Sequence, residues 1–166
     1  MSFIVDGHNL IPKISGLSLS SLDDEQELIA LLQEYCRIRR KTVEIYFDHA
    51  PEGMSGTRAF GTVKVHFVRR GITADNAIIA RIRQMGRSAV NWSVVTSDRR
   101  VQVESRALGA KIIPSEEFSL DMELAKNEAR ARSGVTKDSG ISEADLDEWL
   151  RIFGDADNGK RKKRSP

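Results

Sequence analysis

The chain opens with Phe3-Ile4-Val5-Asp6-Gly7-His8-Asn9, an apolar run that ends on a carboxylate, a glycine and an amide. This run predicts a strand that leaves its sheet at the aspartate, with a glycine that lets the chain turn. The pattern of an apolar run followed by aspartate recurs three times, in Ile45-Tyr46-Phe47-Asp48, Gly71-Ile72-Thr73-Ala74-Asp75 and Val94-Val95-Thr96-Ser97-Asp98. We therefore expect four aspartates at strand exits.

The composition of the 166 residues predicts one domain with a tail. No apolar run approaches the ~20 residues that span a bilayer and no secretory signal is visible, so no membrane contact is expected. Cys36 is the sole cysteine, which excludes an intrachain disulfide and favours a cytoplasmic protein. The net charge is +2. Residues 155–166 hold five basic and two acidic side chains and so carry +3, which leaves −1 for residues 1–154. This total does not by itself indicate a nucleic-acid partner.

Apolar periodicity predicts strands that alternate with helices. After the opening strand, we expect strands over 43–48, 63–68, 92–96 and 110–113, and helices over 21–41, 74–86, 99–108 and 115–132. Thr73 and Ser115 are the expected caps of the second and fourth helices. Residues 10–20 and 49–61, rich in glycine, proline and serine, are expected to be loops. This order predicts an α/β three-layer sandwich with a mainly parallel sheet, whose ligand site lies beyond the carboxyl ends of the strands.

The C-terminal region has its own pattern. The main domain is expected over 1–133, followed by a linker over 134–141, an amphipathic helix over 142–154 and a disordered basic tail over 155–166. The helix is expected to dock on the body or on a partner. The tail carries Lys160, Arg161, Lys162, Lys163 and Arg164, and either binds RNA or a ribosome without specificity or only solubilises the chain.

Four convergent carboxylates are typical of a site for a hard divalent cation such as Mg²⁺ or Mn²⁺, because their mutual repulsion otherwise has no compensation. Each aspartate also has a purely structural interpretation. Asp98 is a possible N-cap, and Asp75 falls in the first turn of a helix. Asp6 is a possible turn residue, and Asp48 ends a strand at the surface. The occurrence of all four at strand exits favours a metal site.

These motifs resemble the YacP-like NYN domain family of PIN-like nucleases, in the segments Ile4-Val5-Asp6-Gly7-His8-Asn9, Tyr46-Phe47-Asp48, Thr73-Ala74-Asp75 and Val95-Thr96-Ser97-Asp98. They run in the family's order and cover about residues 2–125. The resemblance implies a PIN-like fold and a metal-dependent endoribonuclease. Single-stranded RNA is the expected substrate, because its phosphates can reach a recessed metal cluster. It further implies products with a 5′-phosphate and a 3′-hydroxyl, and mRNA cleavage linked to the ribosome.

The resemblance also implies roles for individual residues. The four aspartates would be the acidic ligands of the metal, Asn9 would position a ligand or phosphate oxygen, and Thr96 and Ser97 would hydrogen-bond the carboxylates or the substrate. His8 departs from the family, which often carries tyrosine at this position.

Several basic side chains are further candidates for contacts with phosphates. Arg69 and Arg70, Arg99 and Arg100, and Arg58 are expected either to bind the RNA backbone or to be solvated. His8 and His49 are possible proton shuttles or phosphate contacts, with packing as the alternative, and His66 within a strand is expected to be structural.

Two other functions fit parts of the pattern. One is a catalytically silent RNA- or ribosome-binding module that uses the same face. The other is a phosphatase with Asp6 as covalent nucleophile, which commonly has a second aspartate two residues further on. That position holds His8 in this chain, which counts against the phosphatase.

Overall fold

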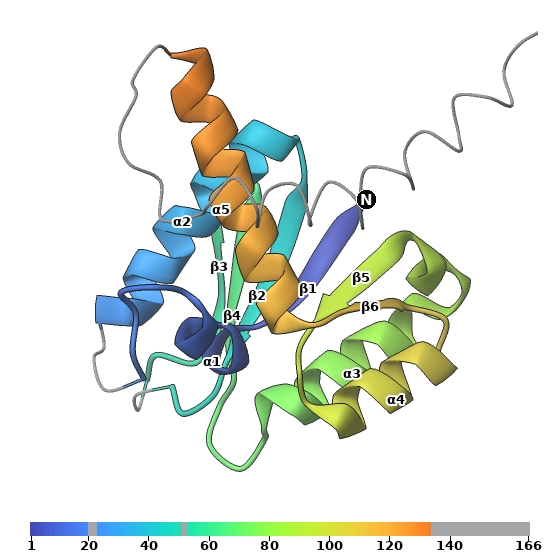
Figure 1. The fold of residues 1–166 in the computed structure, drawn as a ribbon. Helices are drawn as coiled ribbons and strands as arrows, with labels where there is room; N and C mark the ends of the chain where they lie inside the picture. The colour runs from blue at the N-terminus through green and yellow to red at the C-terminus, as the bar shows by residue number, and fades with distance from the viewer. Residues whose placement is uncertain (20–22, 51–52, 134–166) are drawn as a thin grey trace, which may run out of the picture. The chain divides into compact units, whose positions relative to one another are not determined.

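A computed structural model describes residues 1–19, 23–50 and 53–133, and within them it contains one six-stranded sheet (Figure 1). The strand order is β3-β4-β2-β1-β5-β6, and every neighbouring pair is parallel except β3 with β4. The strands are β1 (Ser2–Asp6), β2 (Thr42–Phe47), β3 (Gly56–Phe60), β4 (Val63–Phe67), β5 (Trp92–Val95) and β6 (Lys111–Ile113). The predicted α/β class and mainly parallel sheet are confirmed.

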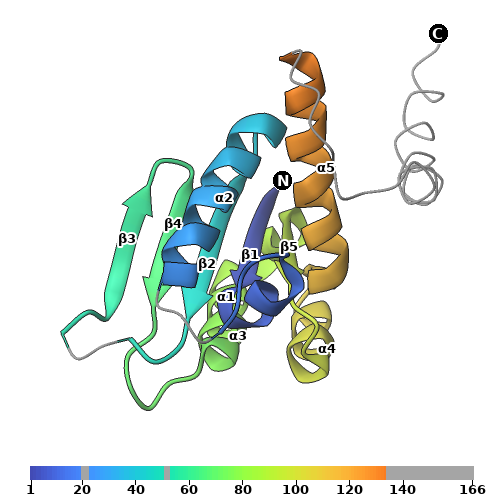
Figure 2. The same cartoon turned by 60° about the vertical axis from the view of Figure 1, so that its left-hand side comes forward.

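Helices cover both faces of the sheet, as parallel crossovers require (Figures 1 and 2). One face carries α2 (Asp23–Arg39) and the first turns of α5 (Ser115–Arg132), and the other carries α3 (Ala74–Met85) and α4 (Arg99–Ala107). The shorter elements are α1 (Gly7–Leu10) and the 3-10 helices η1 (Ile11–Lys13) and η2 (Gly86–Asn91). Thr73 caps α3 as predicted, because its hydroxyl accepts the backbone N–H of Asn76 at 3.2 Å.

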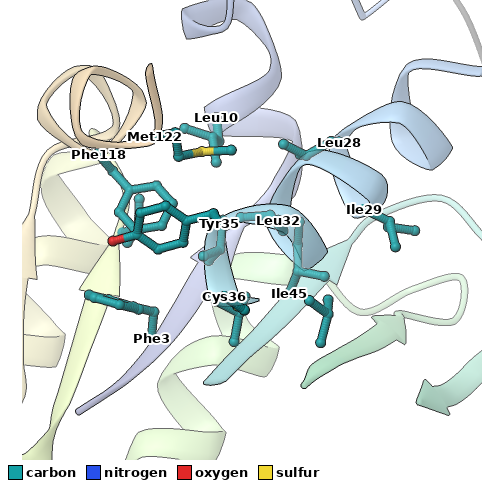
Figure 3. Packing of buried hydrophobic residues seen from close by; sticks show 14 of the residues in the cluster. Phe3, Leu10, Leu28, Ile29, Leu32, Tyr35, Cys36, Ile45, Phe118 and Met122 are labelled. Carbon is teal, nitrogen blue, oxygen red and sulfur yellow. The ribbon is translucent and has the colours of Figure 1, made fainter. Parts of the chain in front are cut away.

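Alternation along β1 decides which face receives each side chain. Phe3 and Val5 belong to the core beneath α2 and α5, whereas Ile4 belongs to the core beneath α3 and α4. By the same alternation, Asp6 points to the α3 side. Figure 3 shows the first of these cores, with labelled side chains from β1, β2, α1, α2 and α5 that include Phe3, Leu28, Leu32, Tyr35, Ile45 and Phe118.

The expected loop over 49–61 is wrong in its second half, where Gly56–Phe60 forms the edge strand β3. All five residues of β3 are exposed, so the strand has no buried face to produce an apolar alternation. Its backbone pairs antiparallel with β4 across a turn at Gly61, which has φ +63°. Pairing of the backbone, rather than side-chain burial, therefore specifies this strand.

The expected loop over 10–20 is wrong at its start. Gly7–Leu10 is a short helix that follows β1 directly, and Ile11–Lys13 continues it as a 3-10 turn with Pro12 at a favourable position. Leu10 and Ile11 are fully buried, which anchors this segment to the core. Gly7 is needed for close packing rather than for an unusual turn, because a Cβ there would overlap the ring of Phe47.

Residues Met1–Lys126 form one compact unit, which contains the site described below. A second unit, Asn127–Pro166, is described only over 127–133, at the end of α5. The predicted linker, the helix over 142–154 and the basic tail lie outside the described residues. No helix in the described ranges has the length and apolarity needed to cross a bilayer.

Candidate active site

The four aspartates lie at the carboxyl edge of the parallel strands. Asp6 is the last residue of β1, and Asp48 follows β2 directly. Asp75 lies in the first turn of α3, which comes after β4, and Asp98 is the N-cap residue of α4, which comes after β5. Asp75 and Asp98 therefore lie at helix N-termini, where negative charge is stabilised.

Asp6 and Asp75 form the centre of the site, because their carboxyl groups hydrogen-bond to each other. Asp6 is only 5% exposed. Burial, then the charge of Asp75, then this hydrogen bond and the charge of Asp48 raise the pKa of Asp6 to about 7. Burial and the charge of Asp98 also raise the pKa of Asp75. Negative charge on the pair is only partly compensated, by the backbone N–H of Asn9 at Asp6 and by the charge of Arg100 at Asp75.

Asp48 and Asp98 also have structural partners. The Asp48 carboxylate accepts the backbone N–H of Ala74 at the start of α3. The Asp98 carboxylate accepts the backbone N–H of Val101 at 3.0 Å and thereby caps α4. The capping interpretation of Asp98 is therefore correct, and its carboxylate also acts electrostatically on Asp75. Each of these two side chains is fixed by a helix that it helps to start.

Thr96 links two of the aspartates from a fully buried position. Its hydroxyl donates to Asp6 at 3.5 Å and accepts the backbone N–H of Asp98 at 3.1 Å. The Thr96 carbonyl accepts from Gln102 of α4 at 2.8 Å. The predicted hydrogen bond from Thr96 to a site carboxylate is present.

Asn9 and Ser97 belong to a second polar network beside the aspartates. Asn9 Oδ1 accepts the backbone N–H of Ser97 and the hydroxyl of Ser115, each at 2.7 Å. Ser97 Oγ accepts the backbone N–H of Ser115 at 3.0 Å and donates to Glu116. Asn9 therefore ties α1 to the segments that follow β5 and β6. In this structure its amide oxygen is occupied by chain contacts rather than directed at the carboxylates.

Glu116 is a member of this network that the sequence reasoning missed. The Ser97 hydroxyl and then Lys13, whose ammonium lies 2.9 Å away, lower the pKa of Glu116 to about 2. Glu116 follows β6 closely, so the rule that located the aspartates at strand exits also applies to it. Ser115, expected only as the cap of α5, donates its hydroxyl to Asn9.

The basic candidates differ in how close they lie to the carboxylates. Arg100 donates to Asn76 at 2.7 Å and to Glu104 at 3.0 Å, and its charge acts on Asp75. Arg69, Arg70 and Arg99 are exposed around the same edge of the sheet. Lys160, Arg161, Lys162, Lys163 and Arg164 lie outside the described residues. Arg58 lies elsewhere, over the ring of Phe67 with 5.9 Å from its guanidinium carbon to the ring centroid.

The histidines have different surroundings. His8 Nε2 lies 2.8 Å from Glu25 of α2, and this hydrogen bond raises the pKa of His8 against the effect of burial. Its ring packs near Phe47, with centroids 5.4 Å apart. His49 is exposed with φ +56°. His66 is half-buried in β4 on the side facing α3, where its ring stacks on that of Tyr46.

The donor chemistry of the site fits a hard divalent cation, since it consists of carboxylate oxygens that repel one another. The hydrogen bond between Asp6 and Asp75 brings two of these carboxyl groups together. Within residues 1–19, 23–50 and 53–133, no three acidic, histidine or cysteine side chains stand close enough to form a metal cluster. If a cation binds, Asp6 and Asp75 are the residues that would hold it, with Asp48 and Asp98 in electrostatic range.

Known proteins share this architecture. The structure of Rae1 (YacP) from Bacillus subtilis matches with a TM-score of 0.66 and 23% identity, over 100% of this chain and 99% of that chain. A point mutant of the same protein matches with a TM-score of 0.64 and 25% identity, over 96% of this chain and 99% of that chain. No curated protein sequence matches. The family model of the YacP-like NYN domain matches residues 3–151 and therefore covers most of the sequence. On this basis, the chain belongs to the YacP-like NYN domain family.

Proposed function

We propose that this protein is a metal-dependent endoribonuclease that hydrolyses phosphodiester bonds in single-stranded RNA. The observation that carries the proposal is the contact between Asp6 and Asp75 at the carboxyl edge of the sheet, flanked by Asp48 and Asp98. Like charges held against each other, with Asp6 buried and Asp75 half-buried, are costly in a folded protein unless a ligand compensates them. Membership in the NYN family supports a nuclease-type activity and an interaction with RNA.

In this proposal, Asp6 and Asp75 would hold Mg²⁺ or Mn²⁺, which when bound would supply a water of lowered pKa and neutralise charge on the scissile phosphate. Thr96 keeps the Asp6 carboxylate oriented through its hydroxyl. Asp48 and Asp98 contribute negative charge from positions that are fixed by α3 and α4.

The RNA backbone would follow the basic side chains around the same edge. Arg100 is already positioned by Asn76, and Arg69, Arg70 and Arg99 are exposed beside it. Such contacts bind phosphates without reading sequence. We further propose that the substrate is mRNA and that cleavage is linked to the ribosome, with the basic residues 160–164 adding non-specific affinity.

Metal-titrated cleavage of an end-labelled single-stranded RNA tests the proposal, with and without ribosomes. We expect cleavage that depends on Mg²⁺ or Mn²⁺, stops with EDTA, and leaves a 5′-phosphate and a 3′-hydroxyl. Asp6→Asn should lower the rate by about 100-fold or more while the protein stays folded. Full activity of folded Asp6→Asn would contradict the assignment of Asp6.

One observation favours a second function, a catalytically silent RNA- or ribosome-binding module. Among the residues that the structure describes, the acidic side chains do not form a cluster of three around one point. A silent module binds RNA equally well in EDTA and in Mg²⁺, and cleaves at no metal concentration. The same titration therefore separates the two functions.

A further inference from the structure

A groove of about 570 Å³ lies beside the candidate active site, between β3, β4 and the first turns of α3, and we name it the β4–α3 groove. Asn76 lines it and directly follows Asp75 in the chain. The groove therefore begins one residue away from the carboxyl pair. Its volume falls within the roughly 300–1,000 Å³ that is typical of small-molecule sites.

The floor of the groove includes the ring of His66, which is held in one orientation. One face of the ring stacks on buried Tyr46, with centroids 4.4 Å apart and 18° between the planes. Nδ1 lies 2.8 Å from the Thr57 hydroxyl, and Nε2 lies 3.5 Å from the Glu44 carboxylate. The partners on one face and at both nitrogens leave the opposite face of the imidazole toward the groove. A fixed aromatic ring with one open face is a platform for stacking a nucleobase.

The walls of the groove suit an aromatic ligand next to a phosphate. Ala77 and Ala80 of α3 leave room above the floor because their side chains are small, and exposed Ile72 adds an apolar edge. Arg69 lines the rim. None of the described residues that line the groove is acidic, so nothing in its wall repels a phosphate.

A second pocket of the described structure has the opposite charge. It has a volume of about 210 Å³ and lies among α2, α5 and residues 14–17. Glu27, Glu34 and Glu123 line it with Lys126 as the one basic side chain in its wall. This excess of carboxylates repels a nucleic-acid backbone. Of these two pockets, charge favours the β4–α3 groove for RNA.

We propose that the β4–α3 groove binds one unpaired base of the RNA, stacked on the open face of His66, with Arg69 beside the adjoining phosphate. The inference rests on the proposed function in that RNA is taken as the substrate. When the scissile phosphodiester lies at Asp6 and Asp75, the neighbouring nucleotide reaches the groove at Asn76. The subsite favours single-stranded over paired RNA at this position, because a base within a duplex has no free face to stack.

The test is a binding experiment rather than a cleavage assay. A fluorescent single-stranded oligoribonucleotide is compared with copies that lack one base at successive positions, and dissociation constants are measured by anisotropy in EDTA. For the unaltered protein, we expect one position at which loss of the base weakens binding about tenfold. Ala80→Trp fills the groove, so it should weaken binding of the intact RNA about tenfold and abolish the effect of the missing base.

Matched variants control for folding and for charge. Ala107→Trp places the same side chain at an exposed position of α4 outside the groove and should leave both dissociation constants unchanged. Arg69→Gln should reduce the slope of log affinity against log salt by about one. Circular dichroism and the thermal midpoint establish that each variant is folded.

The outcomes separate this proposal from the nuclease function. Unaltered RNA binding by folded Ala80→Trp, or a missing-base effect that persists in it, overturns the base subsite. Cleavage by the unaltered protein without a sensitive base position also overturns the subsite but leaves the nuclease function intact. If Ala80→Trp abolishes a base-sensitive position and the unaltered protein cleaves at no metal concentration, the base subsite is supported. The nuclease function is then rejected.

Discussion

Two buried carboxylates on neighbouring strands have opposite titration behaviour. Asp6 of β1 is 5% exposed and Glu44 of β2 is 6% exposed, and the strand register places them two positions apart. Burial raises the pKa of both groups. For Asp6 the charge of Asp75 adds to burial, and the pKa reaches about 7. For Glu44, His66 at 3.5 Å and the hydrogen bonds from Arg81 outweigh burial and lower the pKa to about 2.

The difference lies in where the positive charge comes from. Arg81 meets Glu44 with two hydrogen bonds, of 3.0 Å from Nε and 2.9 Å from a terminal nitrogen. Asp6 has no basic side chain within ion-pair distance in the part of the chain that the structure describes. Glu44 is thus neutralised by the fold itself, whereas Asp6 takes up a proton or requires a cation from solution. The following predictions test this contrast.

Replacement of Arg81, the arginine that pairs with Glu44, should have the largest effect on stability. Arg81→Met removes the two arginine hydrogen bonds from a buried carboxylate and should lower the free energy of unfolding by about 3 kcal/mol at pH 7, measured by urea denaturation. The pKa of Glu44 is depressed in the folded state. The stability that the ionised Glu44 contributes is therefore present above about pH 4.5 and is lost as the pH falls toward about 2. The deficit should therefore shrink in acid. Arg83→Met, at an exposed arginine of the same helix, should change stability by less than about 0.5 kcal/mol.

Removal of the charge of Asp6 should change the free energy of unfolding in the opposite direction. Its folded pKa is raised from 3.8 to about 7, so the stability it contributes is present below pH 3.8 and is lost as pH rises through about 7. Asp6→Asn should therefore stabilise the metal-free protein by about 2 kcal/mol at pH 8 and by almost nothing at pH 4, measured by urea denaturation at both values. Glu44→Gln is the matched control and should destabilise at pH 8. A loss of stability in Asp6→Asn at pH 8 would contradict the unbalanced charge.

Binding of a divalent cation should stabilise the folded protein, as removal of the Asp6 charge does. At a Mg²⁺ concentration of about ten times the dissociation constant, the unaltered protein should gain about 1.4 kcal/mol, seen as a higher thermal midpoint. Asp6→Asn should lose most of this gain, whereas Arg83→Met should retain it. Equal gains in all three proteins would indicate a non-specific effect of the salt.

The sequence located the strands that carry the site and the placement of the aspartates at strand exits, because periodicity and strand ends are local features. It did not reveal that Asp6 and Asp75 touch while Asp48 and Asp98 are held by backbone N–H groups. That division depends on the packing of α3 and α4 against the sheet. The strand β3 was also missed, because an edge strand without a buried face leaves no apolar pattern.

Substitution of Asp98 should give the smallest stability effect of this series. Its side chain combines a structural role with a proposed role in the active site. Asp98→Ala removes the cap of α4 and should cost about 1 kcal/mol, whereas Asp98→Asn keeps a capping oxygen and should stay within about 0.5 kcal/mol of the unaltered protein. Both variants lose the charge that acts on Asp75. Cleavage rates measured beside urea denaturation then separate the roles. If the carboxylate serves the site, the stable Asn variant should be as inactive as the Ala variant. Full activity of Asp98→Asn would show that Asp98 only starts a helix, and that the site depends on Asp6 and Asp75.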